Sequence, residues 1–236
     1  MRYTTNDNKL KTVPFVNEKT HIINGRQKTD FHRTVERTIM DDFLSVIFRR
    51  RSIRKFTEAP VPEEVLIDLL KAGMAGPSAM NAQPWEFVAI TDPEILQKFR
   101  SSLMFAKMNY TAMICVCGSP RVQKNKAGGR FWVQDCSAAT ENILLAATAF
   151  GLGSVWIGVH PIALFVRQVR NILNIPEDVT PLGLIGLGYP AETKEARTQY
   201  EEKYVHWQKY APEPEKRLHL FKHRKNEEVL EDTKEE

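Results

Sequence analysis

The sequence predicts a single α+β domain with additions at both ends, and three observations support this fold class. With 236 residues, the chain is long enough for one ordinary domain and somewhat short for two. Its 42% hydrophobic and 26% charged residues are globular values, which argue against disorder, a collagen-like repeat or a coiled coil as descriptions of the whole chain. Helical and strand patterns alternate without a repeating period, so a solenoid is excluded.

The N-terminal part, residues 1–39, is interpreted as an extension or a leader. It is polar, carries charges of both signs and shows no sustained periodicity before Phe31. An arm packed on the domain or on a partner fits this composition, and so does an upstream leader. The domain is predicted to begin at Met40, because Asp41 and Asp42 favour the positive end of a helix and apolar residues follow at helical spacing.

Four elements are predicted in the first half of the domain. After a loop bracketed by prolines, acidic residues at Glu63 open a helix that ends near Gly76. Alternating, β-rich residues predict a strand over 86–90. A proline in the first turn opens a helix over 93–108, and a second strand follows over 112–118.

The second half begins with the longest helical pattern, over 131–150. Its alanine-rich apolar stripe marks a central core helix, and a glycine just after it is a stop signal. A short strand over 154–159, a helix over 162–173 and a glycine-containing strand over 182–188 complete the predicted domain.

The C-terminal part of the predicted domain 40–236, residues 199–236, is interpreted as an arm with a charged tail. It contains four aromatic residues in a polar context, which would lie along one side of a helix if the segment were helical: Tyr200, Tyr204, Trp207 and Tyr210. Such a segment is too apolar for a free tail and too irregular for a core. It suits an arm laid over another surface.

Charge and cysteine content exclude several classes of protein. The net charge of +4 is near balance, which argues against nucleic acid as a partner. The sequence shows no run of about 18 apolar residues and no N-terminal apolar region, so no membrane partner is expected and the expected compartment is cytoplasmic. No metal site is predicted, because Cys115, Cys117 and Cys136 lack a second cysteine pair or clustered histidines. Buried, inert thiols are expected.

A basic stretch lies at the end of the first predicted domain helix. It places five cations within seven positions: Arg49, Arg50, Arg51, Arg54 and Lys55. The planar fork of arginine matches phosphate, and Ser52 adds a hydroxyl at the same place. The alternative is a solvated basic turn, since cations suit the negative end of a helix.

Three separated stretches, taken in order, resemble the flavin-dependent nitroreductase family. They are residues 50–56 (RRSIRKF), residues 76–85 (GPSAMNAQPW) and residues 186–190 (GLGYP) with the basic residues that follow. The resemblance extends from about Met40 to Tyr210 and includes the alanine-rich helix. It implies a nitroreductase-like α+β fold, with a central, mainly antiparallel sheet flanked by helices, in an intertwined homodimer.

The resemblance implies noncovalent FMN as cofactor and assigns the basic stretch to it. Arg50 and Ser52, next to Arg51, would reach the phosphate and ribityl chain. Arg54 would lie near the pyrimidine side of the isoalloxazine ring. A guanidinium there stabilises the negative charge that reduction leaves on the ring.

The resemblance also assigns residues of the other stretches to FMN. Asn81 would bind the pyrimidine edge, because its amide both donates and accepts; a turn that caps its own backbone is the alternative. Four neighbours would line the ring and ribityl chain: Pro77, Ser78, Ala79 and Met80. The main chain at Ile157 and Gly158 would face flavin N5 and O4, although a buried strand explains the same residues.

Basic residues after the last predicted strand would close the phosphate site. Family members often carry a K-x-R pair here, whereas this chain has K-x-x-R at Lys194 and Arg197. This spacing favours Arg197 and leaves the role of Lys194 open. Both also suit a solvated surface loop.

The function implied by the resemblance is that of an FMN-dependent oxidoreductase. NAD(P)H would deliver hydride to flavin N5, and a small-molecule acceptor of nitroaromatic or quinone type would then take two electrons in a ping-pong reaction. No catalytic side chain is predicted, because the cofactor carries the chemistry. The alternatives are a flavin-binding sensor or storage module, a flavin destructase and a reductive dehalogenase. The lid residues that would separate the enzymes are expected within 99–130.

Overall fold

A computed structural model of the protein describes residues 44–126 and 128–210. By its internal contacts the chain divides into two units, Met1–Arg197 and Thr198–Glu236. The first unit holds all the strands and α-helices described below. The predicted extension over 1–39 and the charged tail beyond residue 210 lie outside the described residues.

One four-stranded antiparallel sheet forms the centre of the first unit, with strand order β1-β2-β4-β3. The strands are β1 (Trp85–Ile90), β2 (Ala112–Gly118), β3 (Gly153–Gly158) and β4 (Thr180–Gly188). The two central strands, β2 and β4, are buried except at Thr180, which is partly exposed, whereas β1 and β3 form the edges. The predicted α+β fold with an antiparallel sheet flanked by helices is confirmed.

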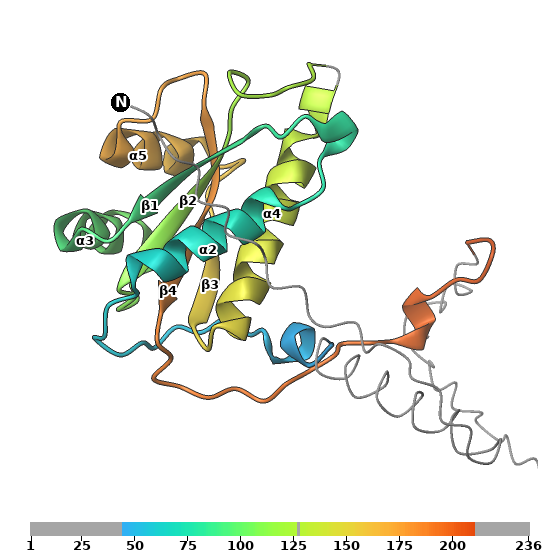
Figure 1. Ribbon diagram of the computed structural model, residues 1–236, viewed down its shortest axis with the longest axis horizontal. Coiled ribbons are helices and arrows are strands. Elements are labelled where there is room, and N and C mark those ends of the chain that lie inside the picture. The colour runs from blue at the N-terminus through green and yellow to red at the C-terminus, as the bar shows by residue number, and fades with distance from the viewer. Residues whose placement is uncertain (1–43, 127, 211–236) are drawn as a thin grey trace, which may run out of the picture. The chain divides into compact units, whose positions relative to one another are not determined.

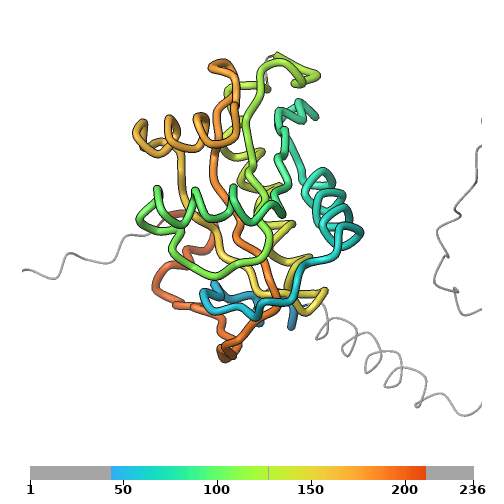
Figure 2. The backbone as a smooth tube through the Cα atoms, turned by 90° about the vertical axis from the view of Figure 1, so that its left-hand side faces the viewer, coloured from blue at the N-terminus to red at the C-terminus, as the bar shows by residue number. Residues whose placement is uncertain are grey.

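Two pairs of helices cover the two faces of this sheet. On one face lie α2 (Glu63–Met74) and α4 (Trp132–Ala149), and on the other lie α3 (Pro93–Ser102) and α5 (Ala163–Leu173). Figures 1 and 2 show this three-layer arrangement, with α2 in teal and α5 in gold on opposite sides. Helical residues 44–49 precede α2.

Strand β2 shows how side-chain alternation builds two cores around one sheet. Met113 and Cys115 belong to the apolar cluster under α3 and α5, whereas Ile114 and Val116 belong to the cluster under α2 and α4. All four side chains are completely buried. Successive residues of a strand point to opposite faces, so an uninterrupted apolar run fits a strand covered on both sides.

Most predicted elements differ from the observed ones by one or two residues at their ends, but the helix predicted over 93–108 is wrong at its C-terminus. Helix α3 ends at Ser102, and a separate 3-10 turn spans Met104–Ala106. Leu103 between them adopts an extended backbone and is only 3% exposed. Burial of this side chain in the core competes with continuation of the helix.

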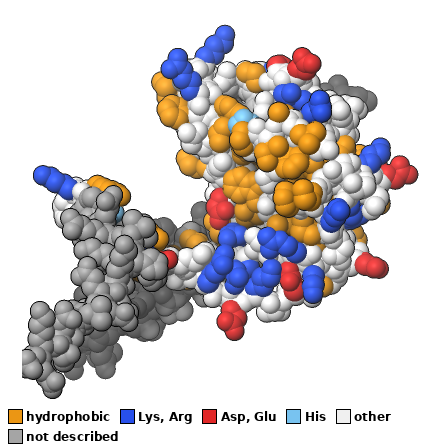
Figure 3. Space-filling view, turned by 180° about the vertical axis from the view of Figure 1, so that it is seen from behind, with side chains coloured by type: hydrophobic (Ala, Val, Ile, Leu, Met, Phe, Trp, Pro, Cys, Tyr) orange, Lys and Arg blue, Asp and Glu red, His pale blue; other side chains and the backbone are white. Residues whose placement is uncertain are grey.

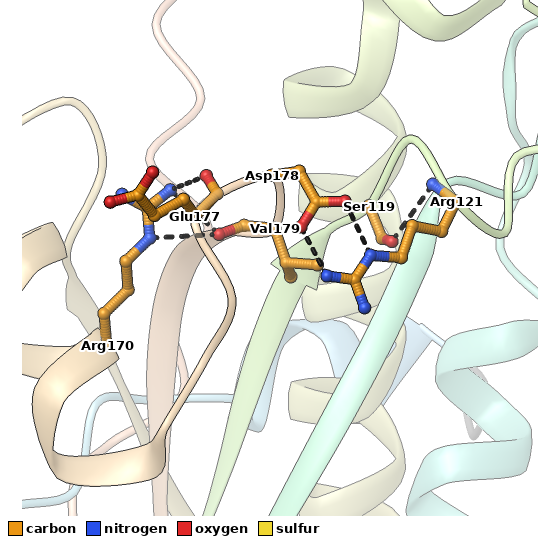
Figure 4. Close-up of polar contacts among 6 residues, drawn as sticks. All are labelled: Ser119, Arg121, Arg170, Glu177, Asp178 and Val179. Atoms are coloured by element: carbon orange, nitrogen blue, oxygen red, sulfur yellow. Dashed lines mark hydrogen bonds and ion pairs between the residues drawn. The ribbon is translucent and has the colours of Figure 1, made fainter.

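A polar network joins the turn after β2 to the segment before β4 (Figure 4). Arg121 donates from Nε to Asp178 Oδ2 at 2.6 Å and from Nη2 to the second carboxylate oxygen. This bonding holds the pKa of Asp178 below its ordinary value. Arg170, at the end of α5, donates to the main-chain oxygens of Glu177 and Val179. The approach to β4 is therefore fixed from two sides.

In the second unit, residues 198–210 contain a single 3-10 turn, Glu202–Tyr204. Val205 follows it with an extended backbone, so the helix considered for this segment does not form. Four aromatic side chains are between 70% and 78% exposed: Tyr200, Tyr204, Trp207 and Tyr210. The expected aromatic surface is present, but on an irregular segment.

Candidate functional site

Two stretches far apart in the sequence run side by side at the end of the sheet. The main-chain N–H of Arg54 donates to Glu192 Oε1 at 2.6 Å, and that of Arg197 donates to Phe48 O at 3.0 Å. Arg51 Nη1 donates to the main-chain oxygen of Glu195. The basic stretch and the segment after β4, which the sequence assigned to one phosphate site, therefore lie together.

Lys194 is held within this pair of segments. Its Nζ donates to Ser52 O at 2.6 Å and lies 3.3 Å from Glu192 Oε1. Hydrogen bonds from the main-chain N–H of Arg54 and from Lys194 lower the pKa of Glu192. The ammonium of Lys194 is thus bonded within the chain. Arg197, by contrast, is an exposed residue.

Arg50 leans toward α4 from the end of helical residues 44–49. Its Nε lies 3.4 Å from Glu141 Oε1, and its side chain is one quarter exposed. Burial raises the pKa of Glu141, while the neighbouring guanidinium acts to lower it. Glu141 was not predicted from the sequence, because nothing in its helical position identifies a partner distant in the chain.

The edge strand β3 presents its main chain to the same region. Ile53 N–H donates to Ser154 O at 2.9 Å, in a parallel bridge between Ser52 and Ser154. Because main-chain groups alternate along a strand, those of Trp156 and Gly158 point to the same open side as Ser154. Of the two positions that the resemblance named, Gly158 is the one whose N–H faces this edge.

A cavity of about 430 Å³ lies along this edge. Its lining includes the predicted residues Arg54, Ile157 and Gly158. The remaining lining residues are mostly apolar or aromatic: Phe105, Met108, Val155, Trp156, His160, Ile162 and Phe165. On the face shown in Figure 3, Lys and Arg side chains gather beside a hydrophobic surface. The volume is within the usual range of small-molecule sites.

Gly158 provides a test of whether this cavity fits a bound ring. A Cβ added there would meet nothing within 4 Å, and its φ is not positive. By contrast, a Cβ at Gly183 would lie 2.4 Å from Trp156 Nε1. The chain's own packing explains the glycine at 183 but not the one at 158. A molecule approaching the strand closely explains it, so the residues fit a planar cofactor with its phosphate toward the cations.

The stretch with Asn81 has a different location. It forms a 3-10 turn, Ala79–Asn81, in which Met80 and Asn81 have φ values of 51° and 54°. The N–H of Ala79 donates to Asp135 Oδ1 at 2.9 Å, which fixes the turn to the start of α4. None of its residues lines the cavity along β3. Within one chain the predicted contacts at Pro77, Ser78, Ala79, Met80 and Asn81 are therefore separate from Arg54 and Gly158.

Several lining residues were not identified from the sequence. Phe105 and Met108 lie in the segment where the lid was expected, but their spacing carried no signal for a site. His160 lies two residues beyond the end of β3 and has an ordinary loop context in the sequence. Its ring packs against the edge of Trp132, with ring centroids 4.9 Å apart.

The cysteines are buried, as expected. Cys115 and Cys117 have Sγ atoms 3.6 Å apart, and burial raises the pKa of Cys136 to about 12. Among residues 44–126 and 128–210, no group of three or more histidine, cysteine, aspartate or glutamate side chains is placed to hold a metal ion. No helix in that part of the chain has the length and apolar character needed to cross a membrane.

Comparisons with known proteins agree with this architecture. The nitroreductase family model matches residues 47–107 and 104–189. A protein of Archaeoglobus fulgidus, provisionally named NADH dehydrogenase/NAD(P)H nitroreductase, is 41% identical over 176 residues, covering 72% of this chain and 100% of that protein.

Two solved structures extend the comparison to the cofactor. An FMN-dependent nitroreductase of Clostridium difficile has a TM-score of 0.62 and 30% identity, covering 71% of this chain and 99% of that one. A provisionally named nitroreductase of Desulfovibrio desulfuricans, solved in complex with FMN, has a TM-score of 0.60 and 26% identity, covering 72% and 98%.

The fold and these matches define the protein as an enzyme of the oxidoreductase class. The chain belongs to the nitroreductase family. The predicted family and the prediction of an enzyme are therefore confirmed.

Proposed function

We propose that this chain is an FMN-dependent oxidoreductase that passes hydride from NAD(P)H to nitroaromatic or quinone-type acceptors in a ping-pong reaction. The observation that carries the proposal is the cavity along β3, where Gly158 leaves open space beside a basic stretch. FMN, when bound, accepts a hydride and returns two electrons to a second substrate. The relatives named for FMN and for NAD(P)H support this assignment.

The residues of the chain hold and tune the cofactor. Arg50, Ser52 and Arg197 would bind the phosphate end, with Arg51 and Lys194 bracing the two segments through main-chain contacts. The exposed guanidinium of Arg54 would favour the reduced ring, because positive charge stabilises developing negative charge. The main-chain N–H of Gly158 would orient the ring at the edge of β3.

We propose further that the working form is a homodimer with FMN at the interface. None of residues 79–81 lines the cavity of its own chain, and Met80 in this turn is exposed. A second copy would bring this turn, with Pro77, Ser78 and Asn81, onto the flavin held by Arg54. Two incomplete half-sites would thus be completed by association.

The direct test is purification followed by heat release and chromatography of the bound flavin. FMN is expected, with bleaching by NADH or NADPH under anaerobic conditions and recolouring by an added quinone. A protein that binds neither FMN nor FAD would refute the proposal. A yellow protein that no nicotinamide bleaches would instead be a flavin-binding module.

Gly158→Ala tests the site within the proposed function. Because a Cβ there meets nothing in the chain, the thermal stability of the apoprotein should stay unchanged while FMN affinity falls. Gly158→Val should lower the affinity further. FMN titration by fluorescence quenching and thermal unfolding of the apoprotein measure the two effects separately. Unchanged FMN affinity in both variants would contradict the assigned location.

A further inference from the structure

We propose that His160 donates a proton to the electron acceptor, a planar quinone bound in the cavity along β3; this inference rests on the proposed function. Of the lining residues, Arg54 and His160 are the two with ionisable side chains. Histidine is the residue type whose ordinary pKa lies closest to neutrality, which makes it the more suitable proton donor.

The position of His160 is fixed by its neighbours. Its main-chain N–H donates to Leu182 O at 3.0 Å, and its ring packs on Trp132. Trp132 in turn lies against Gly118, where an added Cβ would come within 2.1 Å of the indole ring. The imidazole is half-buried and lines the cavity two residues beyond Gly158. Gly118 therefore leaves room for the indole of Trp132, and this indole packs against the imidazole at the cavity.

The walls of the cavity indicate the class of acceptor. Phe105 and Phe165 meet edge to face, with ring centroids 6.3 Å apart, and Ile162 belongs to the same lining. Phe105 and Ile162 are 62% and 49% exposed, so part of this apolar wall faces open space. A flat aromatic molecule would cover this wall and leave its carbonyl oxygen near the one imidazole of the lining.

The stoichiometry of the reaction requires such a proton. A quinone becomes a hydroquinone by gaining two electrons and two protons. The hydride from the reduced cofactor supplies both electrons and one hydrogen nucleus, which gives one O–H bond. The second carbonyl oxygen, left as an anion, takes the proton from the Nε2 or Nδ1 of the imidazolium. The neutral imidazole then regains a proton from water, so atoms and charge balance.

The other charged residues that line this cavity and the one at Trp132 are lysine, arginine and aspartate. Arg54 lies in the same lining as His160, and a second cavity of about 340 Å³ is lined by Trp132 together with Lys126, Arg130 and Asp178. Lysine and arginine stay protonated and aspartate stays ionised between about pH 5 and 8. A change of rate over this range is therefore expected to report on His160.

The experiment follows the oxidative half-reaction of the holoenzyme by anaerobic stopped flow. Wild type, reduced with one equivalent of NAD(P)H, is mixed with menadione between about pH 5 and 8. Its reoxidation rate should fall as the pH rises, because histidine can donate this proton only in its cationic form. His160→Gln keeps a hydrogen-bond donor without a titrating proton, so it should lose this pH dependence and be about 100-fold slower at low pH. His160→Phe, which keeps an aromatic ring against Trp132, should behave in the same way.

A second measurement does not depend on turnover. Acetophenone, which carries one carbonyl oxygen, is titrated into the oxidised holoenzyme and followed by the shift of the flavin spectrum. Its dissociation constant should increase with pH in wild type and be independent of pH in His160→Gln. Equal pH dependence in both proteins would overturn the inference.

The remaining outcomes separate the inference from the proposed function. If the variants are bleached by NAD(P)H at the wild-type rate but keep the wild-type pH profile of reoxidation, His160 is not the donor. If bleaching slows as much as reoxidation, His160 serves the nicotinamide and the inference is overturned. A wild type without FMN, or without bleaching, would overturn the proposed function and the proton-donor role together.

Discussion

Arg50 and Arg54 are four residues apart, yet their surroundings differ. Arg50 is partly buried against α4 and has Glu141 at 3.4 Å, so its guanidinium is already oriented. Arg54 is anchored through its main chain to Glu192, while its exposed side chain lines the cavity. The first arrangement suits a fixed phosphate contact, and the second suits an adjustable cation beside a ring whose charge changes.

Substitution of the two arginines should therefore have different effects on the bound flavin. Arg50→Ala should weaken FMN binding about ten- to a hundredfold, because a charge-assisted contact contributes about 1.5 to 3 kcal/mol. Arg54→Ala should retain more affinity but lower the midpoint potential of the flavin, since the reduced anion loses its counter-charge. FMN titration and spectroelectrochemistry measure these quantities.

Lys55→Ala is the matched control, because it removes an exposed cation of the same stretch that the resemblance does not assign to FMN. It should change neither quantity strongly. Equal potentials for wild type and Arg54→Ala would remove the electrostatic role of Arg54. Equal losses of affinity in all three variants would indicate a diffuse charge effect.

At the scale of single elements, local sequence signals decide where helices begin more reliably than where they end. Asp92 caps α3: its Oδ1 accepts from Glu94 N at 2.7 Å and from Ile95 N at 3.3 Å, just before a proline in the first turn. The end of the same helix depends on Leu103, which is buried by residues distant in the sequence.

Loss of the cap should destabilise the whole domain modestly. Asp92→Ala should lower the free energy of unfolding by about 1 kcal/mol, and Asp92→Ser should recover most of it. Chemical denaturation monitored by circular dichroism provides the measurement. If the alanine variant matched wild type while flavin content stayed constant, the cap would have no energetic role.

The elements and most of their limits follow from periodicity, because each of the four strands and each of the helices α2 to α5 buries a face against one of two cores. The strand order could not be predicted, since the pairing of β2 with β4 joins segments about 70 residues apart and depends on packing. The same holds for the site. The motifs predicted Arg54 and Gly158, but Glu141, Glu192 and His160 gain their roles only through contacts made in the fold.

At the scale of the whole molecule, the exposed aromatic side chains of residues 200–210 are unusual for a monomer. Tyr204, Trp207 and Tyr210 are each more than 70% exposed in the second unit. Exposed apolar groups of this size commonly mark interfaces. A second copy of the chain is the partner that the proposed shared flavin site also requires.

Ending the chain before Tyr200 should therefore weaken both the dimer and flavin retention. Light scattering measures the mass, and the absorbance ratio of flavin to protein measures the content of FMN. As a control, Tyr200→Ser and Tyr210→Ser in the full chain distinguish loss of aromatic contact from loss of the segment. A truncated protein that stays dimeric and fully yellow would show that this segment does not hold the dimer together.

The open edge of β3 also affects the solubility expected of the protein before it binds FMN. Among residues 44–126 and 128–210, the bridge to this edge is the one between Ser52 and Ser154, and the main-chain groups of Trp156 and Gly158 are directed outward beside the apolar lining of the cavity. An uncovered strand edge is a template on which another chain can add a strand, and this is a route to aggregation. A bound ring would block that route. The yield of soluble protein should therefore depend on the supply of FMN during synthesis. The test is to concentrate the apoprotein: its solution should become turbid, and added FMN should reverse the turbidity.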